Sequence, residues 1–569
     1  MCSLLLRLHH FALQELKLID PSMGSGHILV YAFDVLMQLY EAEGELPRIA
    51  AETILKQNLF GLDIDKRAFQ LAYFALMMKG RQYSRRILTK GIRPNVYAVP
   101  DNAGIGEAEL QLLHGNFPDQ AKAHQDLLAL TSGFQHGHDL GSLISFEGID
   151  FENLKSGLSG GVSFIDEAVH EMVLVGELLQ QKYAVGVTNP PYMGSSGFST
   201  VLADFSKRFY SGSKSDMSTM FMERMSKIVL TGGYYAILNI PVWMFISSYE
   251  KLRKKMILEE TFINMSHNGR GIFGSDFGTT SFIMKKGKSH GYISTFLRLF
   301  DNTGEVKSIE TKESYFLTRK GISFINQDMF TKIPGSPISY WVSENLIHDF
   351  VVGKRMDEIV TPKQGLATAD NDRFLRLWWE VDINQIKFDS TSITDSVLSG
   401  KKWFPYNKGG AFRRWYGNYD YIVNWENNGE EIRNFVDDKG KLRSRPQNTE
   451  YYFKEAITWP LITSGGLSAR FRERGSIHDV SGMSAFSSNQ DDIYYALGMV
   501  NTPIGNNILK VLNPTINSQV GDFQNIPIIV ADYDYKSEII SYVKSAIHLV
   551  KTDWNTEGDK WDFKRHPLV

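Results

Sequence analysis

An asparagine, two prolines and a tyrosine stand together at Asn189, Pro190, Pro191 and Tyr192, directly after the apolar run YAVGVT. Two successive prolines fix the backbone in an extended shape and remove two N–H donors. The Asn189 amide and the Pro190 carbonyl can then accept hydrogen bonds from an exocyclic amino group, and the Tyr192 ring offers a face for stacking a base. The alternative is an ordinary proline-stiffened loop, but two features upstream favour the chemical interpretation.

The first of these features is the loop DPSMGSG, from Asp20 to Gly26, between an apolar run and a long helical pattern. Glycines let the backbone turn sharply and approach a ligand, and the N–H groups at the helix start suit a carboxylate. Asp20 could hold an ammonium group of the same ligand. A glycine loop taken alone is equally consistent with a tight strand-to-helix turn.

The second feature is Asp63, which closes the run LFGLD about forty residues downstream. In a βαβ unit, a carboxylate at this place accepts hydrogen bonds from ribose hydroxyls. Surface aspartates at strand ends are common, so only the combination with the glycine loop indicates a nucleoside ligand. Asp65 is predicted to be the N-cap of a helix that begins at Lys66.

These residues require a sheet whose strands end side by side. The first half of the chain alternates short apolar runs with amphipathic helical patterns, which predicts a doubly wound, Rossmann-like α/β domain over residues 1–330. Its strands are expected at 16–19, 59–63, 183–189 and 234–240, with a strand pair at 262–265 and 281–284. Its helices include 28–44, 47–58, 66–80 and 217–229. Residues 102–182 have a weak pattern and are expected to form an insertion or loop region, with a helix at 166–182.

The composition of the chain restricts the classes of protein to which it can belong. The chain has 569 residues, 43% of them hydrophobic and 22% charged, as in soluble proteins of two or three domains. The only cysteine is Cys2, so an intramolecular disulfide and a cysteine-built zinc site are excluded, and a cytoplasmic setting fits best. The uncharged stretch 228–249 contains glycines and a proline and is predicted to be a buried strand with flanking turns, so we expect no transmembrane helix. No signal peptide is expected either.

Turn-forming residues at 331–345 predict a linker, and residues 346–569 are expected to form a second, mixed α/β domain rich in Trp, Tyr, Asn and Arg. Three basic clusters in it suit phosphate contacts and base reading, although solvated charge explains any one of them. The predicted DNA-binding residues are Arg413, Arg414, Lys441, Arg443, Arg445, Arg470, Arg472 and Arg474. No metal site is expected, because His114, His136 and His138 lack ligand spacing and are predicted to face solvent.

The three motifs D-P-x-x-G-x-G, an acidic residue after the second strand, and N-P-P-Y together resemble the amino-methyltransferases of DNA, in the class whose target-recognition region comes last. The resemblance implies S-adenosylmethionine as the cofactor. It implies that the cofactor contacts Asp20, Pro21, Ser22, Gly24, Gly26, Asp63, Ile64 and Asn116, with Ile64 against its adenine and Asn116 near its amino group. It also implies that Asn189 to Tyr192 form the catalytic loop.

The chain is more closely similar to the PglX-type adenine methyltransferases of BREX phage-defence systems. This similarity rests on NPPYMGSSG, FYSGSKSDMSTMFMERM and GLATADNDRFLRLWWEV, and it extends over most of the chain. It implies double-stranded DNA as substrate and other BREX proteins as partners, and no membrane. Only nineteen residues precede Asp20, so we expect a truncated member without the upstream segment that helps to cover the cofactor.

The resemblance implies transfer of a methyl group to adenine N6 after the base has been swung out of the duplex, with Tyr192 stacking on it. Phe273 or Phe277 could form the far wall of the base pocket or could equally be core residues. Two other functions remain open from the sequence. One is methylation of a protein glutamine amide, and the other is a DNA- or partner-binding subunit with an incomplete cofactor site. No restriction nuclease is expected.

Overall fold

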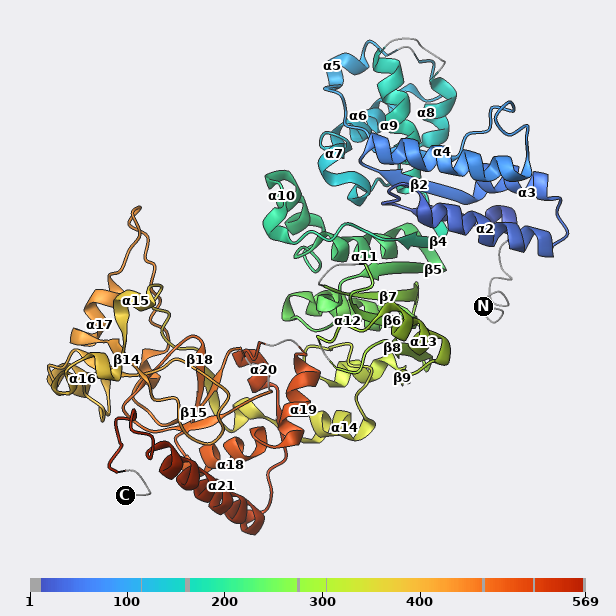
Figure 1. Ribbon diagram of the computed structural model, residues 1–569. Coiled ribbons are helices and arrows are strands. Elements are labelled where there is room, and N and C mark those ends of the chain that lie inside the picture. The colour runs from blue at the N-terminus through green and yellow to red at the C-terminus, as the bar shows by residue number, and fades with distance from the viewer. Residues whose placement is uncertain are drawn as a thin grey trace. The chain divides into compact units, whose positions relative to one another are not determined.

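The computed structural model describes residues 12–113, 115–158, 164–273, 277–302, 304–462, 466–514 and 517–565. The chain divides into two compact units, unit 1 from Met1 to Thr331 and unit 2 from Lys332 to Val569 (Figure 1). The division falls at the start of the segment 331–345, where the sequence predicts a linker. Each unit is described separately below.

Unit 1 is built on a mixed nine-stranded sheet with the order β3-β2-β1-β4-β5-β7-β6-β8-β9. Strands β1 to β5 are parallel, whereas β7 runs antiparallel to both of its neighbours, β5 and β6. The strands are β1 (Leu18–Asp20), β2 (Leu59–Asp63), β3 (Asn95–Ala98), β4 (Tyr183–Thr188), β5 (Val229–Asn239), β6 (Thr261–Arg270), β7 (Gly278–Lys285), β8 (Ile293–Arg298) and β9 (Ile322–Asn326). The predicted Rossmann-like α/β fold is confirmed.

Three helices pack near one end of this sheet. Helices α2 (His27–Ala42), α3 (Pro47–Thr53) and α4 (Lys66–Tyr83) share a core with the strands, centred on fully buried residues such as Leu29, Phe33 and Leu76. The N-cap of α4 is Asp65, as predicted, because its side chain accepts a hydrogen bond from the N–H of Arg67. The apolar faces of α2 and α4 pack these helices against the sheet. Because α2 follows β1 and α4 follows β2, the loops that precede the two helices lie at the carboxyl edge of the sheet.

The segment 102–182 is largely helical, not the irregular insertion with one helix that the sequence suggested. It contains α5 (Glu107–Leu110), α6 (Gln120–Gly133), α7 (Gly137–Leu140), α8 (Phe151–Gly157) and α9 (Phe164–Gln180). Helix α6 buries Leu127 and Leu130 but consists largely of polar and small residues. Its apolar pattern is therefore weak, and the sequence alone does not predict it. Helix α9 matches the helix predicted at 166–182.

The remaining helices of unit 1 follow β4 along the chain. They are α10 (Thr200–Phe209), α11 (Met217–Ile228), α12 (Glu250–Glu259) and α13 (Ile309–Thr318). The uncharged stretch 228–249 holds β5 and a short 3-10 turn at Pro241–Met244, in agreement with the predicted buried strand. Among the described residues, no helix is both long and apolar enough to span a membrane.

Unit 2 contains two four-stranded sheets and a two-stranded pair. Their orders are β11-β18-β15-β16, β12-β14-β13-β17 and β10-β19. The strands are β10 (Lys354–Arg355), β11 (Thr361–Lys363), β12 (Leu375–Leu377), β13 (Trp403–Asn407), β14 (Tyr421–Asn424), β15 (Ala456–Pro460), β16 (Arg470–Arg472), β17 (Ile477–His478), β18 (Gly482–Phe486) and β19 (Pro527–Ile528). The prediction of a mixed α/β unit is confirmed.

The helices of unit 2 are concentrated toward the end of the chain. They are α14 (Glu344–Val352), α15 (Asn371–Phe374), α16 (Ile393–Leu398), α17 (Glu426–Arg433), α18 (Gln490–Val500), α19 (Pro503–Leu512), α20 (Val520–Gln524) and α21 (Tyr533–Trp554). One core of the unit gathers buried aromatic residues around Trp425, Phe404 and Phe453. These aromatics explain why the sequence of this half is rich in Trp and Tyr.

Candidate active site

The glycine turn, residues 20–26, joins the end of β1 to the start of α2. Gly24 and Gly26 have φ values of +54° and +84°, a conformation that side chains with a Cβ rarely adopt. A Cβ at position 26 would also lie 3.0 Å from the Cα of Ala72 on α4. Glycine is therefore required here both for the turn and for the close approach of two helices.

Asp20, at the carboxyl end of β1, is fully buried. Its Oδ1 accepts hydrogen bonds from the N–H of Ser22 (3.1 Å) and the hydroxyl of Thr188 (2.8 Å). Burial raises the pKa of Asp20 to about 7, and these two hydrogen bonds only partly oppose the shift. Its Oδ2 is buried and has no hydrogen-bond partner within the described part of the chain. A buried acceptor of this kind is suited to a cationic donor from a ligand.

Asp63, at the carboxyl end of β2, is partly engaged by the protein itself. Its Oδ2 accepts from the N–H of Gly24 (2.9 Å) and its Oδ1 from the N–H of Asp65 (2.9 Å). Each carboxylate oxygen can accept a further hydrogen bond, so Asp63 ties the glycine turn to β2 without losing its capacity to bind a hydroxyl. Ile64, the next residue, is 52% exposed, which leaves its side chain open to a ligand.

The tetrapeptide 189–192 follows β4. The hydroxyl of Tyr192 donates to Oδ1 of Asn189 (2.7 Å) and lies 3.4 Å from the carbonyl oxygen of Leu238. Burial raises the pKa of Tyr192 to about 12, so the phenol remains protonated and can act as this donor. The Tyr192 ring also meets Phe277 edge-on, at 5.6 Å between ring centroids. Pro190 is buried, whereas Asn189 and Pro191 are exposed.

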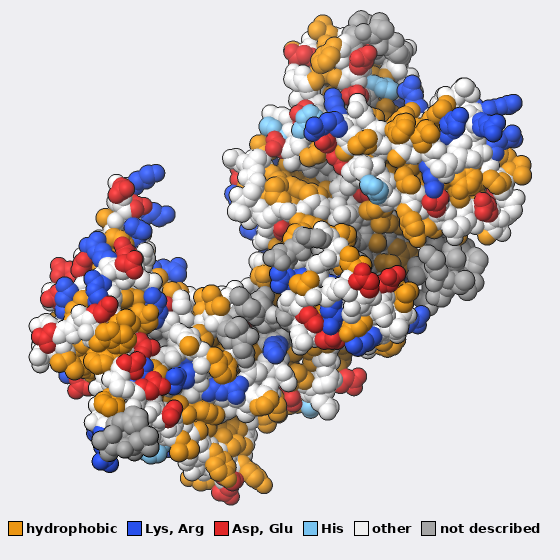
Figure 2. All heavy atoms as spheres, viewed as in Figure 1, with side chains coloured by type: hydrophobic (Ala, Val, Ile, Leu, Met, Phe, Trp, Pro, Cys, Tyr) orange, Lys and Arg blue, Asp and Glu red, His pale blue; other side chains and the backbone are white. Residues whose placement is uncertain are grey.

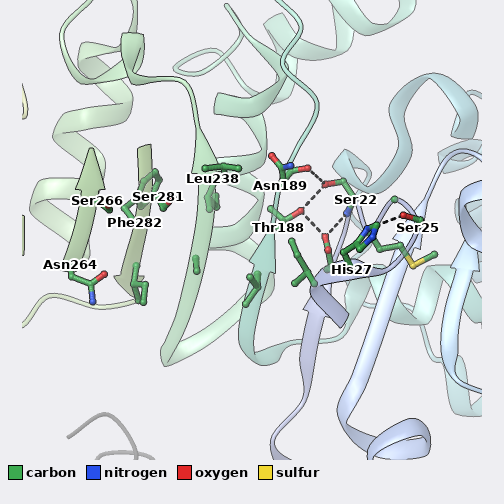
Figure 3. Close-up of a pocket in the computed structure, with 18 of the residues that line it drawn as sticks. Ser22, Ser25, His27, Thr188, Asn189, Leu238, Asn264, Ser266, Ser281 and Phe282 are labelled. Carbon is green, nitrogen blue, oxygen red and sulfur yellow. Dashed lines mark hydrogen bonds between the residues drawn. The ribbon is translucent and has the colours of Figure 1, made fainter. Parts of the chain in front are cut away.

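The glycine turn and the tetrapeptide are in direct contact. The Ser22 and Thr188 hydroxyl oxygens are 2.7 Å apart, and the Ser22 hydroxyl is 3.5 Å from the carbonyl oxygen of Asn189 (Figure 3). The contact follows from the sheet order, because β1 and β4 are neighbouring parallel strands and both end at the same edge. Two motifs separated by some 160 residues in the sequence therefore form one site.

A cavity of about 630 Å³ extends from this contact across β4, β5, β7 and β6. One end is lined by the glycine turn, His27 and Asn189, and the other by Leu238 and polar side chains of β6 and β7 (Figure 3). The complete lining is Asp20, Ser22, Met23, Gly24, Ser25, His27, Ile28, Val187, Thr188, Asn189, Ala236, Ile237, Leu238, Asn264, Ser266, Ser281, Phe282, Ile283 and Phe316. Asp20 and Asn189 thus face the same cavity.

Several predicted site residues lie elsewhere. Asn116 is exposed, donates its N–H to the carbonyl of Gly157 (2.9 Å) and is not among the residues that line the cavity. The first polar residue after β3 is Asp101, whose carboxylate lies 2.8 Å from Nδ1 of His138. His138 is exposed but bonded, His136 is exposed, and His114 lies outside the described residues. No metal-binding cluster of His, Cys, Asp or Glu occurs among the residues that the structure describes.

Of the two phenylalanines proposed for the base pocket, neither is a core residue. Phe273 is 58% exposed and Phe277 is 45% exposed. Only Phe277 is in ring contact with Tyr192. The structure thus favours Phe277 as the wall beside the tetrapeptide.

The predicted DNA-binding residues of unit 2 separate into two groups. Lys441, Arg443, Arg445 and Arg474 are exposed, and Arg413 and Arg414 are half-buried. Arg470 and Arg472 are buried, so the prediction that they contact DNA is wrong in this structure. Their guanidinium groups donate instead to the carbonyl of Gly409 (2.7 Å) and the hydroxyl of Ser476 (2.9 Å). Strand β16 places both side chains inside the unit, which a basic run in a sequence does not reveal.

Comparison with known proteins identifies relatives of the whole chain. The chain is 37% identical to "Adenine-specific methyltransferase PglX" of Lacticaseibacillus casei (strain Zhang) and 35% identical to "Adenine-specific methyltransferase BrxX" of Escherichia coli O9:H4 (strain HS). The chain is thus similar over almost its whole length to the adenine-specific methyltransferases PglX and BrxX. Each alignment covers 98% of this chain and 47% of the relative, so the chain spans about half the length of these proteins. Residues 57–273 match the family model of the Eco57I restriction-modification methylase. The resemblance found in the sequence is confirmed.

Solved structures share the fold. The restriction-modification enzyme MmeI, in complex with DNA, matches 97% of this chain with a TM-score of 0.52 at 11% identity, and 67% of MmeI is covered. A nuclease-deletion mutant of the enzyme LlaGI, with a DNA substrate mimic, matches 96% of this chain with a TM-score of 0.55 at 11% identity, and 45% of that protein is covered. At this identity the likeness establishes the arrangement of elements and nothing finer.

Sequence reasoning missed three residues of the site. Thr188 links Asp20 to Ser22, His27 lines the cavity, and Ser142 donates to the carbonyl of Pro21 (2.5 Å). Thr188 could have been found, because it directly precedes Asn189 on a strand that adjoins the strand of Asp20. Ser142 could not, because nothing in a weakly patterned segment indicates which strand end it reaches.

Proposed function

We propose that this chain carries the methyl-transfer site of an S-adenosylmethionine-dependent DNA adenine-N6 methyltransferase. The observation that supports it most strongly is the shared cavity, whose lining residues include both Asp20 and Asn189. The first is suited to a cationic cofactor, and the second to an amino group that accepts a methyl group. The homology to adenine-specific methyltransferases supports the same reaction.

The residues of the glycine turn fit S-adenosylmethionine. Asp20 Oδ2 would hold its ammonium group, and the N-terminus of α2 would face its carboxylate. Asp63 would accept from the ribose hydroxyls and Ile64 would lie against the adenine ring, with Pro21, Ser22, Gly24 and Gly26 shaping the turn. Neither Asp63, Ile64 nor Asn116 lines the cavity. Asp63 is nevertheless hydrogen-bonded to Gly24 of the glycine turn, so Asn116 is the weaker proposal. When bound, the cofactor supplies an electrophilic methyl group on its sulfonium sulfur.

The tetrapeptide would bind and orient the target base. Asn189 Oδ1 and the Pro190 carbonyl would accept the two N–H groups of adenine N6, which turns the nitrogen lone pair toward the cofactor. Tyr192 would stack on the extruded base and partly offset the cost of unstacking, roughly a few kcal/mol. Tyr192 donates to Asn189 Oδ1 in the structure, and this oxygen has a second lone pair that can accept from N6.

Unit 2 would read the DNA. After α17, the bridge between Val436 and Leu442 closes a hairpin whose turn is held by Asp437. The hairpin projects from unit 2 (Figure 1), and Lys and Arg side chains gather toward its end, with acidic side chains beside them (Figure 2). We propose that the exposed basic residues Lys441, Arg443, Arg445 and Arg474 contact phosphates, together with the half-buried Arg413 and Arg414. Partners among other BREX proteins are proposed on the homology alone.

Sequencing of host DNA tests the proposed function. The gene is expressed with its genomic neighbours, beside a variant with Asn189→Ala, and N6-methyladenine is mapped across the genome. The proposal predicts a mark at a defined motif that the variant loses. A mark that persists in the variant, or no adenine mark in either strain, would refute it.

A further inference from the structure

Residues 137–143, here called the bridging segment, lie against the ends of three parallel strands. The segment comprises α7 and a 3-10 turn at Gly141–Leu143. After β1, the Ser142 hydroxyl donates to the carbonyl of Pro21 in the glycine turn (2.5 Å). After β2, Gly141 packs so closely that a Cβ would lie 2.8 Å from Ile64, and after β3 a Cβ on Gly137 would lie 1.8 Å from the carbonyl oxygen of Pro100. The segment is therefore fitted to the edge that carries the proposed cofactor site.

The same segment is held from the other side by residues that follow the tetrapeptide. The Nε of Arg224, on α11, donates to the carbonyl of Ser142 (2.7 Å). The hydroxyl of Tyr210 donates to the carbonyl of Leu143 (2.8 Å), and the hydroxyl of Ser199 donates to Asp139 (3.0 Å). Side chains at three positions from the N-cap of α10 to the middle of α11 thus hold a segment of seven residues.

Helix α11 is in turn fixed to the tetrapeptide. The N–H of Met217 donates to the carbonyl of Met193 (2.9 Å), directly after Tyr192, and the N–H of Ser195 donates to the carbonyl of Ser215 (3.0 Å). A continuous chain of hydrogen bonds therefore runs from Pro21 through Ser142 and α11 to the residue after Tyr192. It is independent of the short contact between Ser22 and Thr188.

Arg224 is the unusual member of this chain. It is 1% exposed, and among the described residues it has no carboxylate partner, since its guanidinium donates to the carbonyls of Ser142 and Leu179 (2.8 Å). Burying a charge without a counter-charge is costly, so an apolar residue would fill this space at lower cost if packing were its only role. A planar guanidinium, however, can hold two carbonyl groups in a fixed geometry.

We propose that Ser142 and Arg224 are positioning residues that fix the distance between the glycine turn and the tetrapeptide. The helical insertion would then serve the reaction, by holding the methyl donor and the acceptor base in line. This inference rests on the proposed function for its catalytic meaning, but the mechanical link itself can be measured without cofactor or DNA.

Hydrogen exchange of the full chain without ligand tests the link. In Ser142→Ala, peptides that cover residues 20–26 are expected to exchange about five- to tenfold faster than in the parent, the effect of losing one buried hydrogen bond. The matched control is Thr131→Val, which removes another buried hydroxyl of the same insertion, one that donates within α6 to the carbonyl of Leu127. The control is expected to leave exchange in residues 20–26 unchanged.

A second pair of variants reports on the other end of the link. Arg224→Met is expected to speed exchange in residues 137–143 and 20–26, whereas Arg253→Met, which removes a buried arginine from α12, is expected to leave both regions unchanged. If Arg224→Met does not fold, the comparison of Ser142→Ala with Thr131→Val still tests the proposal. Unchanged exchange at 20–26 in folded Ser142→Ala would overturn the proposal.

Methyl-transfer kinetics separate this inference from the proposed function. Ser142→Ala is expected to lower kcat about tenfold, with a smaller effect on the KM for DNA, because donor and acceptor are bound but misaligned. If the link is present by hydrogen exchange but the parent transfers no methyl group, the proposed function fails and the link stands. If the parent is active and Ser142→Ala has parental kcat and faster exchange, the positioning role is overturned.

Discussion

Replacement of Asp20 by asparagine should stabilise the fold and abolish cofactor binding at the same time. Asp20 is fully buried with a pKa of about 7, against the usual value of 3.8, chiefly because burial penalises its charge. Between these two values the native state holds the proton and the unfolded chain releases it. The contribution of Asp20 to stability is therefore complete below pH 3.8 and is lost as the pH rises to about 7.

The loss in the free energy of unfolding can be calculated from the difference between the two pKa values of Asp20. About three pH units at about 1.4 kcal/mol each give a penalty of about 4 kcal/mol at pH 8. Asparagine carries no charge, and its Oδ1 can still accept from Ser22 and Thr188, while its amide nitrogen takes the place of an oxygen without a partner. Asp20→Asn should recover much of the penalty at pH 8 and little at pH 4, with a rise in Tm of several degrees at pH 8.

Thermal unfolding at pH 4, 6 and 8, with and without S-adenosylmethionine, measures both effects. The control is Asp65→Asn, at a half-exposed N-cap position where asparagine caps equally well. Hydrogen bonds from Arg67 lower the pKa of Asp65, so this variant is expected to show no gain in Tm over the parent as the pH rises. The cofactor should raise the Tm of the parent and of the control but not that of Asp20→Asn. A Tm of Asp20→Asn that does not increase relative to the parent between pH 4 and pH 8 would refute the reasoning about burial.

Three further outcomes are expected. Asn189→Ala should lower kcat for methyl transfer at least a hundredfold and leave the calorimetric affinity for S-adenosylmethionine unchanged, since Asn189 would bind the base and not the cofactor. Tyr192→Phe should retain most of kcat, because the stacking ring stays. Tyr192→Ala should lower kcat/KM about ten- to a hundredfold through lost stacking. Lys441→Ala should reduce the slope of the logarithm of the DNA-binding constant against the logarithm of the salt concentration by about 0.9. Arg470→Met should instead lower the Tm of unit 2, because Arg470 is buried. Filter binding over a salt series and calorimetric unfolding distinguish the last two, and equal salt slopes for the parent and Lys441→Ala would contradict the DNA assignment.

The sequence predicts much of the site because each motif ends a strand. Asp20 and Asp63 are the last residues of β1 and β2, and Asn189 follows β4. These strands lie side by side, so strand prediction alone brings the three residues to one edge. Local signals such as glycine turns and double prolines act over a few residues, and a single sequence suffices to read them.

The sequence predicts less well those side chains whose position depends on contacts between distant segments of the chain. Arg470 and Arg472 belong to a basic run but alternate with Phe471 on a strand buried on both sides, so their exposure depends on neighbours far along the chain. The resemblance implies a cofactor contact at Asn116, whereas the first polar residue after β3 is Asp101. The role of Ser142 depends on a fold of the insertion that no periodicity reveals.

Mass spectrometry of DNA after incubation with the protein and S-adenosylmethionine labelled in its methyl group tests the central claim most directly, in the parent and in Asn189→Ala. The account predicts label on N6 of adenine with the parent and none with the variant. Label on cytosine, label on a protein amide, or equal labelling by the two proteins would contradict it.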